Sequence, residues 1–379
     1  MDLHFNMTAA FTKWVVASGA LHEPFVVVDI GVQGGENVRW HLLGDHLVVH
    51  GFDAIEEVVE TLKQENRGKP NRHYHWVAAG SADEEREFYF NAADPCSSSF
   101  YPHGVDRFET ERREQPRKVQ VRRLDTLLKQ GIVANPDFLK TDVEGFEKEV
   151  FLGAPELLRS VLGIETETNF GVSPTYPKSH FGTLQEILLG HHLLVFDLNF
   201  NRVARASFQR ALMRKGLHAV TDQKSAGKPA TLNVLFCRDL IDEIDQPGNY
   251  IGPCEPFNVD QLIKMMIVYE LHGLNDIALD SADRFKDRLS GRLDVDKAID
   301  LLADPYCMTP GGAPAATAGD DTSGALQAAN AALKQRIREL EASSSVLERH
   351  IHDLESSTSW QATAPLRALR KALARSSRG

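Results

Sequence analysis

Short apolar segments recur through the first 240 residues and alternate with segments of helical periodicity. The first, FVVVDI at 25–30, is continuously apolar. Such strands are typical of parallel sheets covered on both faces, so the pattern predicts an α/β domain with a mostly parallel seven-stranded sheet. The further strand-like runs are 46–53, 73–80, 136–142, 161–168, 192–199 and 231–237, with helical patterns at 54–65, 144–152 and 182–190, and 86–90 and 118–124 as short extra strands or hairpin pieces.

The same pattern divides the chain into segments of different character. A Pro/Gly/Ala/Thr stretch without core-forming residues separates the globular part from a long polar helix, and such a composition predicts a flexible linker. The predicted segments are a leading helix (1–24), the alternating domain (25–240), a helical extension (241–308), the linker (309–324), a coiled coil (325–357) and a basic tail (358–379).

Composition narrows the functional classes. The net charge of −11 argues against a protein that binds nucleic acid through backbone electrostatics. The four cysteines, Cys96, Cys237, Cys254 and Cys307, lack CxxC spacing, so neither a zinc site nor a disulfide framework is expected. Neither a long apolar run nor an apolar signal core is present, and the sequence therefore predicts a cytoplasmic protein.

Polar residues gather where the predicted strands end. Ligands of open α/β sheets bind at the carboxyl ends of the strands, so these residues are candidates for a site. The set consists of Asp29, Asp53, Ser81, Asp83, Asp142, Glu144 and residues 165–169. It predicts that carboxylates line one edge of the sheet.

A glycine-containing loop, DIGVQGG at 29–35, follows the first strand. Glycines allow the backbone to turn tightly and to approach a ligand closely. Asp53 ends the next strand, where an acid accepts hydrogen bonds from a ribose diol. Asp29 before the first glycine suits a cofactor with a positive sulfonium and would repel a pyrophosphate. A dinucleotide site and a tight turn without a ligand are the alternatives.

At this point the chain resembles the FkbM family of S-adenosylmethionine-dependent methyltransferases. The family's Asp-Val-Gly-Ala-Asn-x-Gly loop corresponds to 29–35, and its Phe-Glu-Pro to Phe52-Asp53-Ala54. The most specific blocks are LDTL (124–127), DFLKTDVEGFEKEVFLGAPELL (137–158) and LGIETE (162–167). Gln33 and Ala54 depart from the family's Asn and Pro. The resemblance covers roughly 25–205, with a plausible end near 237.

The resemblance implies a Rossmann-like class I methyltransferase fold and S-adenosylmethionine as cofactor. Methyl transfer to oxygen is an in-line displacement that needs alignment and removal of the hydroxyl proton. We expect Asp142, Glu144 and Glu165 to be catalytic, although Glu144 also suits the first turn of a helix. The expected cofactor-binding residues are Asp29, Gly31, Gly35, Asp53 and Asp83.

The sequence does not decide whether the protein binds a divalent metal. Glu165 and Glu167 share one face of the fifth predicted strand. With Asp142 they could form an oxygen-rich site of the magnesium type. The alternative is a carboxylate that holds a neighbouring loop by hydrogen bonds.

Two loops combine hydroxyls with aromatic rings, which suits a sugar acceptor as well as an ordinary surface loop. They are CSSSFY at 96–101 and NFGVSPTY at 169–176. His180, His191 and His192 are candidate bases or polar residues at helix ends.

Leucines recur every seven residues in the C-terminal arm. Asn330, Ile337, Ser344 and Ile351 fall between them, a pattern typical of a parallel two-stranded coiled coil. We therefore expect a homodimer through 325–357, with a single helix packed on the body as the alternative. The leucines are Leu326, Leu333, Leu340, Leu347 and Leu354.

The tail contains Trp360 and several basic residues, and it resembles segments that follow coiled coils in bacterial polysaccharide-modifying enzymes. It is either a peripheral contact with an anionic inner-membrane face or a solvated tail. The predicted function is O-methylation of a hydroxyl, of a sugar in a glycan or glycoconjugate. A catalytically degenerate scaffold that assembles through its coiled coil is the alternative, and a small-molecule or lipid acceptor is left open.

Overall fold

The computed structural model describes six stretches of the chain: residues 8–92, 94–101, 114–171, 179–203, 228–240 and 257–303. The predicted linker at 309–324, coiled coil at 325–357 and tail at 358–379 lie outside these residues and stay predictions. The same holds for residues 172–176 of the second candidate acceptor loop.

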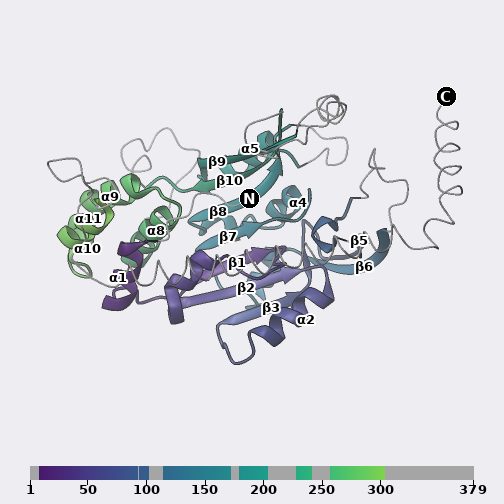
Figure 1. The fold of residues 1–379 in the computed structure, drawn as a ribbon, viewed down its shortest axis with the longest axis horizontal. Coiled ribbons are helices and arrows are strands. Elements are labelled where there is room, and N and C mark those ends of the chain that lie inside the picture. Colours follow the sequence, from purple (N-terminus) through teal and green to yellow (C-terminus); the bar gives the residue numbers. More distant parts are fainter. Residues whose placement is uncertain are drawn as a thin grey trace, which may run out of the picture. The chain divides into compact units, whose positions relative to one another are not determined.

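A seven-stranded sheet forms the centre of the fold (Figure 1). The first five strands in its order run parallel, and β10 pairs antiparallel with both of its neighbours. The mostly parallel seven-stranded α/β sheet is thus confirmed. Its order is β3 (Arg72–Trp76), β2 (Leu47–Asp53), β1 (Phe25–Ile30), β7 (Phe138–Thr141), β8 (Gly163–Asn169), β10 (Lys228–Cys237) and β9 (Leu194–Val203).

The run predicted as one strand at 73–80 is divided between two sheets. Its second part is β4 (Ala78–Ala79), which joins β6 (Glu114–Arg122) and β5 (Glu84–Asn91) in a three-stranded sheet. β5 and β6 form the antiparallel pair expected from the two short extra segments. Alternation along them buries apolar side chains on one face, which packs near the carboxyl edge of the main sheet. These side chains are Phe88, Phe90, Val119 and Val121.

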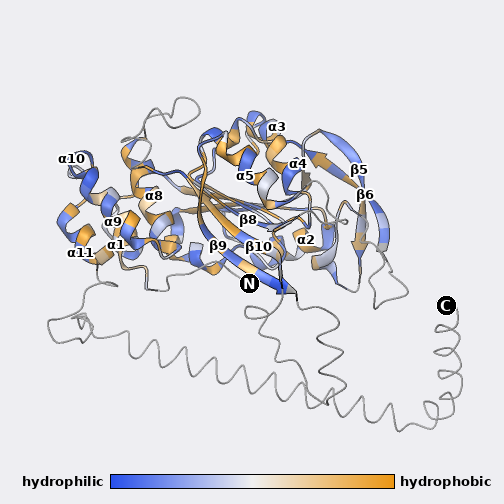
Figure 2. Ribbon diagram, turned by 90° about the horizontal axis from the view of Figure 1, so that it is seen from above, coloured by the Kyte–Doolittle hydropathy of each residue, from blue (hydrophilic) through white to orange (hydrophobic). Residues whose placement is uncertain are grey.

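One face of the main sheet is covered by three short helices. They are α3 (Leu124–Lys129), α4 (Glu147–Leu152) and α5 (Phe181–Leu189). Val28, Ile30 and Leu139 of the central strands belong to the same buried cluster as Leu127, Val150 and Leu184 of these helices. Apolar residues concentrate on the strands between the helical layers (Figure 2). The strands are therefore continuously apolar for the expected reason, because both of their faces are buried.

The opposite face is covered by elements from both halves of the chain. They comprise α1 (Ala10–Ser18), the 3₁₀ segment η1 (Val38–His46), α8 (Val259–Leu271), α9 (Asn275–Arg284), α10 (Lys286–Leu289) and α11 (Val295–Ala303). Helix α8 is apolar around most of its circumference and is buried there, as expected for an interior helix. It shares one core with Phe25, Val27 and Phe138 of the sheet. Near β3 this face is covered by α2 (Glu56–Glu65) instead.

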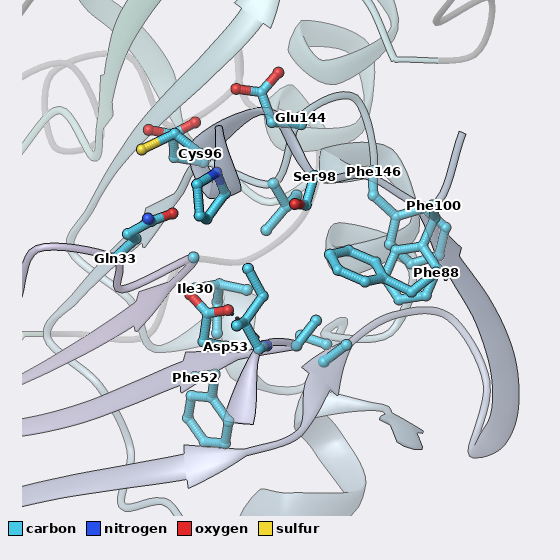
Figure 3. A pocket seen from close by; sticks show the side chains of 18 of the residues that line it. Ile30, Gln33, Phe52, Asp53, Phe88, Cys96, Ser98, Phe100, Glu144 and Phe146 are labelled. Carbon is cyan, nitrogen blue, oxygen red and sulfur yellow. Dashed lines mark hydrogen bonds between the residues drawn. The ribbon is translucent and has the colours of Figure 1, made fainter. Parts of the chain in front are cut away.

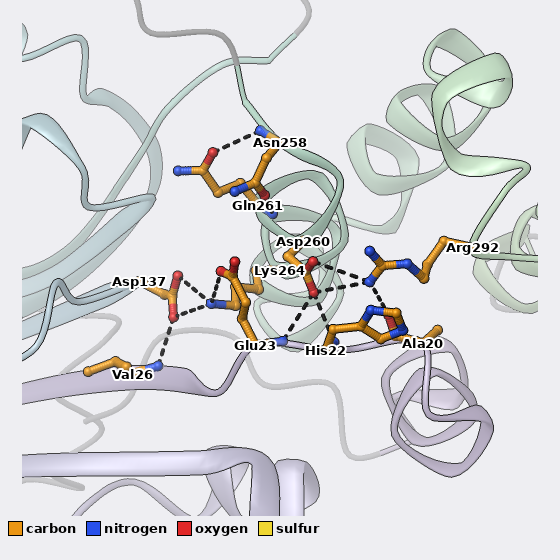
Figure 4. Close-up of polar contacts among 10 residues, drawn as sticks. All are labelled: Ala20, His22, Glu23, Val26, Asp137, Asn258, Asp260, Gln261, Lys264 and Arg292. Atoms are coloured by element: carbon orange, nitrogen blue, oxygen red, sulfur yellow. Dashed lines mark hydrogen bonds and ion pairs between the residues drawn. The ribbon is translucent and has the colours of Figure 1, made fainter.

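Buried charges hold α8 in place (Figure 4). Lys264 Nζ lies 3.0 Å from the Asp137 carboxylate, which also accepts a hydrogen bond from Val26 N. Asp260 accepts from His22 N at 2.9 Å and pairs with Arg292 at 3.2 Å. Each of these contacts joins α8 to a distant part of the chain, so residues 257–303 are packed into the body of the domain.

Among the helices that the structure describes, none is long and apolar enough to cross a membrane.

Candidate active site

A cavity opens at the carboxyl ends of β1, β2 and β7 (Figure 3). Backbone of the glycine loop forms one side, and the loop after β7 forms another. Parts of the second sheet and of the short 3₁₀ segment η2 (Pro95–Ser97) complete it. Its polar lining consists of Gln33, Asp53, Cys96, Ser98, Lys140, Asp142, Glu144 and Glu167.

Gly31 stands where the glycine loop meets the loop after β7. Its φ is +80°, and a Cβ built there would lie 2.0 Å from the backbone oxygen of Asp142. Both the left-handed conformation and the close approach exclude any side chain. Gly31 N donates to Phe52 O at 2.9 Å, and Gly31 O accepts from Lys140 Nζ at 2.9 Å. The turn is thus fixed to β2 and β7, with its backbone facing the cavity.

Asp53 ends β2 and lines the cavity. One carboxylate oxygen accepts a hydrogen bond from Ile55 N at 2.8 Å, which orients the side chain. Burial raises the pKa of Asp53 to about 6, against the lowering effect of that hydrogen bond and of Lys140. The carboxylate is therefore held in one direction and carries its charge at neutral pH.

Glu144 occupies a strained position in the loop after β7. Its φ is +51°, a left-handed conformation that is uncommon for a residue with a side chain. Ser99 Oγ donates to Glu144 O at 2.7 Å, and the Glu147 carboxylate accepts from Val143 N and Gly145 N on either side. Strain held by several contacts is typical of functional sites.

Acidic side chains accumulate around this loop. We call Asp142, Glu144 and Glu167 the outer carboxylates, because all three line the cavity. Burial, followed by the charges of Asp142 and Glu167, raises the pKa of Glu144 to about 8. Burial also raises the pKa of Glu167. A cation bound here would favour the ionised forms and so would be stabilised by them.

The inner wall of the cavity is apolar. Phe88, Phe100 and Phe146 form a cluster whose rings lie 4.3 to 5.2 Å apart in successive pairs. Ile55 and Ala78 belong to the same cluster. One compartment with an apolar end and a carboxylate-rich end suits a ligand with a flat ring system at one end and a positive charge at the other.

Residues 29–187 match the family model described as the methyltransferase FkbM domain. This segment contains the glycine loop, strands β2 and β7, and the loop after β7. The match supports the family that the sequence blocks indicated, and with it an S-adenosylmethionine-dependent methyltransferase.

No curated protein matches the chain. Similar solved structures include precorrin-6y C5,15-methyltransferase from Geobacter metallireducens GS-15, with 10% identity, a TM-score of 0.26, and 62% of this chain and 94% of that chain covered. TehB from Haemophilus influenzae has 13% identity, a TM-score of 0.30, and coverages of 60% and 62%. N-methyltransferase NodS from Bradyrhizobium japonicum WM9, in complex with S-adenosyl-L-homocysteine, has 8% identity, a TM-score of 0.26, and coverages of 60% and 85%. With such low TM-scores, the functional conclusions below rest on the FkbM match and on the cavity.

The specific block of the FkbM-type domain places Lys140, Asp142 and Glu144 at the cavity. Lys140 Nζ lies 3.3 Å from Asp29 Oδ1 and 3.7 Å from Asp142 Oδ2. The lysine therefore pairs with two acids. Asp142 remains partly accessible, with 39% of its side chain exposed, so it is available to a ligand.

Glu165 lies outside the cavity, so its expected catalytic role needs correction. Its carboxylate lies 3.3 Å from Arg39 Nη1 and 3.9 Å from His272 Nε2. Burial works against its charge, yet His272 and Arg39 keep the pKa of Glu165 below its usual value. Glu167, two residues further along β8, is the member of the pair that lines the cavity.

Three expected cofactor residues also lie away from the lining. Asp29 is buried behind Lys140, and burial raises its pKa to about 6. Gly35 packs near Leu62 of α2, and its N–H donates to Val32 O, so it shapes the loop. Asp83 accepts hydrogen bonds from Arg123 N and Thr126 Oγ1 at 2.8 Å, so it caps the start of α3. Asp29 and Gly35 thus hold residues and backbone that line the cavity, whereas Asp83 has a local structural role.

The oxygen-rich metal arrangement considered from the sequence does not form with Glu165, whose carboxylate faces Arg39. Among the residues that the structure describes, no group of three or more His, Cys, Asp or Glu side chains is arranged to hold a metal ion.

Of the candidate acceptor loops, the first contributes to the cavity through Cys96, Ser98 and Phe100. In the second, Phe170 follows β8 and is 45% exposed. His180 precedes α5 and contacts Thr183 through Nε2 at 3.0 Å. His191 and His192 follow the other end of α5, and none of the three histidines lines the cavity.

Sequence reasoning missed Glu147. It is buried, and burial raises its pKa to about 7 against the hydrogen bonds that it accepts from Ser179, Gly145 and Val143. Through these bonds it holds the Glu144 loop. Its place in the first turn of α4, just after a strand-end loop, was the available signal, because such acids often bind free N–H groups of the preceding loop.

Proposed function

We propose that the FkbM-type domain binds S-adenosylmethionine in this cavity and transfers its methyl group to a hydroxyl. The proposed acceptor is the hydroxyl of a sugar in a glycan or glycoconjugate. The observation that carries the proposal is the convergence of Gly31, Asp53 and the outer carboxylates at one strand-end cavity inside the segment that matches the family model.

The residues present fit the cofactor along its length. The Asp53 carboxylate suits the two ribose hydroxyls, and the cluster around Phe146 suits the adenine ring. Gly31 leaves its backbone open to the ligand. Asp142 supplies negative charge for the ammonium end. S-adenosylmethionine supplies the methyl group and the positive sulfonium that makes it transferable.

Glu144 is our candidate for the base that accepts the hydroxyl proton. Its pKa of about 8 places it in the range where a carboxylate can accept a proton from a reacting group efficiently. A positive ligand beside it lowers that pKa, so cofactor binding favours the ionised, proton-accepting form. The fixed backbone around Glu144 keeps the carboxylate at the cavity.

For the acceptor, the first candidate loop is the supporting feature. Ser98 and Cys96 line the cavity, and Phe100 adds an aromatic face beside them. A sugar offers hydroxyls and an apolar face, which match such a lining. The basic tail adds support for a glycan on an assembly pathway at the cell surface, through its resemblance to segments of polysaccharide-modifying enzymes.

The test has two stages with the full-length chain. Calorimetry with S-adenosylmethionine measures binding, and methyl transfer is then assayed against the host's own glycan intermediates. We expect binding and an alkali-stable methyl ether on a sugar. The Asp83→Asn variant is the matched control, because the sequence placed Asp83 among the cofactor-binding residues but its side chain lies outside the cavity. Absence of binding would instead favour the scaffold function, and transfer to an amine would contradict the hydroxyl acceptor.

A further inference from the structure

A row of charged side chains crosses the sheet just behind the cavity. Asp29 on β1 is the register partner of Lys140 on β7, which is the partner of Glu165 on β8. Side chains of register partners in parallel strands point to the same face, so the three stand side by side. We call them the inner row. Lys140 at its centre reaches Asp29, Asp142 and the Gly31 carbonyl.

The row is covered by two residues from outside the strands. Arg39 of η1 is completely buried and contacts Glu165 at 3.3 Å. His272, directly after α8, donates from Nδ1 to Val268 O at 2.7 Å, which leaves Nε2 toward Glu165. Its ring stacks on Phe138 with centroids 5.4 Å apart. One hydrogen bond and one stack thus fix the ring over Glu165. Its Nε2 lies 3.9 Å from the carboxylate, beyond hydrogen-bond distance, and burial lowers the pKa of His272, so the charge beside Glu165 comes from Arg39.

We propose that Arg39 and His272 are positioning residues for the cofactor site: Arg39 holds Glu165 beside Lys140 by charge, His272 covers it by packing, and Lys140 is thereby fixed at the glycine loop. The inference rests on the proposed function. A buried carboxylate needs compensating charge, and Arg39 supplies it for Glu165 as Lys140 does for Asp29. The helical extension, through His272, therefore covers the inner row, although it does not line the cavity.

The charge balance determines the sign of the expected effect. Neutralising Glu165 leaves Lys140 and Arg39 with one negative partner fewer. The added positive potential opposes binding of the positive sulfonium in the adjacent cavity. It also favours ionisation of Asp29, whose pKa is otherwise raised by burial and, in smaller part, by Asp142 and Glu165, against the effect of Lys140. Tyr74, the other titratable group facing Asp29, is unchanged by the substitution.

The same helix offers a matched control. Asp260 lies near the start of α8, is buried, and pairs with Arg292 (Figure 4). It docks α8 to the body but has no contact with the inner row. Weakened docking alone should lower the melting temperature in an Asp260→Asn variant and leave cofactor binding unchanged.

The experiment compares full-length wild type with Glu165→Gln, His272→Phe and Asp260→Asn. Calorimetry from pH 5 to pH 8 gives the dissociation constant for S-adenosylmethionine and the pH midpoint of binding. We expect Glu165→Gln to weaken binding about tenfold at pH 7.5 and to move the midpoint to lower pH. His272→Phe keeps the aromatic stack and should weaken binding about threefold by loosening Glu165. Asp260→Asn should match wild type.

Two outcomes overturn the inference alone: wild-type binding and midpoint in both Glu165→Gln and His272→Phe, or equal weakening in Asp260→Asn. If Glu165→Gln does not fold, His272→Phe decides between these outcomes. A wild-type chain that does not bind S-adenosylmethionine overturns the proposed function first, and the inference with it.

Discussion

The inner row crosses β1, β7 and β8, while the outer carboxylates lie on β8 and in the loop after β7, and the charges of the two groups are balanced differently. In the inner row, Asp29 and Glu165 each face a cation, Lys140 or Arg39. Among the outer carboxylates, like charges face one another, and the pKa of Glu144 is raised to about 8. The acids of the inner row are held in close ion pairs, whereas the outer carboxylates line the cavity, with Asp142 at 3.7 Å from Lys140. Glu165 and Glu167, two residues apart on β8, thus differ in their surroundings: the first pairs with Arg39 and the second lines the cavity.

Gly31 is the point where both groups meet, so its replacement should have the largest effect. In Gly31→Ala the new Cβ would lie 2.0 Å from Asp142 O, at a φ of +80°. We expect the loss of about 4 kcal/mol of cofactor binding, roughly a thousandfold, measured by calorimetry. Gly34→Ala is the control, since its φ is +85° but no atom lies within 4 Å of its Cβ. Equal losses in both variants would show that only backbone strain matters.

Removing the central cation should break the inner row. Lys140→Met leaves Asp29 buried without its partner, which typically costs about 3–5 kcal/mol of unfolding free energy. Urea unfolding at pH 8 and pH 5 measures it. The pKa of Asp29 is already raised, so the loss should shrink at pH 5, where a protonated Asp29 needs no cation. Asp142→Asn, in the outer group, should cost less than about 1 kcal/mol. A similar loss in both variants would remove the distinction between the two groups.

Replacement of the candidate base tests the outer carboxylates. In Glu144→Gln we expect kcat for methyl transfer to fall about a hundredfold. Cofactor affinity should fall to a smaller extent, because the ionised carboxylate favours the positive ligand. The wild-type kcat/KM should rise as the pH approaches 8, because Glu144 of the free enzyme must lose its proton, and the variant should lack this rise. The variant should also unfold at a higher temperature at pH 9, since burial of the ionised carboxylate destabilises the folded state. An unchanged pH–rate profile would exclude Glu144 as the base.

A smaller effect is expected at the ribose position. Asp53→Asn should weaken cofactor binding about tenfold at pH 7.5, because an amide is a poorer acceptor for two hydroxyls. The pKa of Asp53 is about 6, so wild-type affinity should fall as the pH drops through 6 and the two proteins should converge near pH 5. Calorimetry across this range measures the difference. If the ratio of the two dissociation constants stays the same across this pH range, Asp53 is not the cause of the pH dependence.

The smallest change is expected at Asp83. Asp83→Asn should leave cofactor binding unaltered and cost at most about 1 kcal/mol of stability, as for the loss of a helix cap. Thermal unfolding and calorimetry on the same sample provide both values. A large loss of affinity for S-adenosylmethionine in this variant would show that Asp83 does belong to the cofactor site.

Much of this arrangement was predictable from local pattern. Apolar runs such as 25–30 located the strands, and the FkbM blocks located Asp142 and Glu144 at the strand-end loop. The alternation of β8 placed Glu165 and Glu167 on one face but could not say which would be covered. That depends on Arg39 and His272, which are 126 residues before and 107 residues after Glu165 in the sequence. The place of Asp83 was hidden for a similar reason, because its hydrogen-bond partners Arg123 and Thr126 lie at the start of α3, 40 and 43 residues further along the chain.

The Glu270 carboxylate binds the N–H groups of Phe11 and Thr12 at the start of α1, across a separation of 259 residues for the first of them. No residue of α1 provides a side-chain cap there, so the first turn depends on a group that the ribosome adds much later. During synthesis the sheet face under α8 stays uncovered until this helix emerges. Contacts of such long sequence separation slow folding and prolong exposure of apolar surface. The nascent chain therefore completes its domain late, and should need protection from aggregation until then.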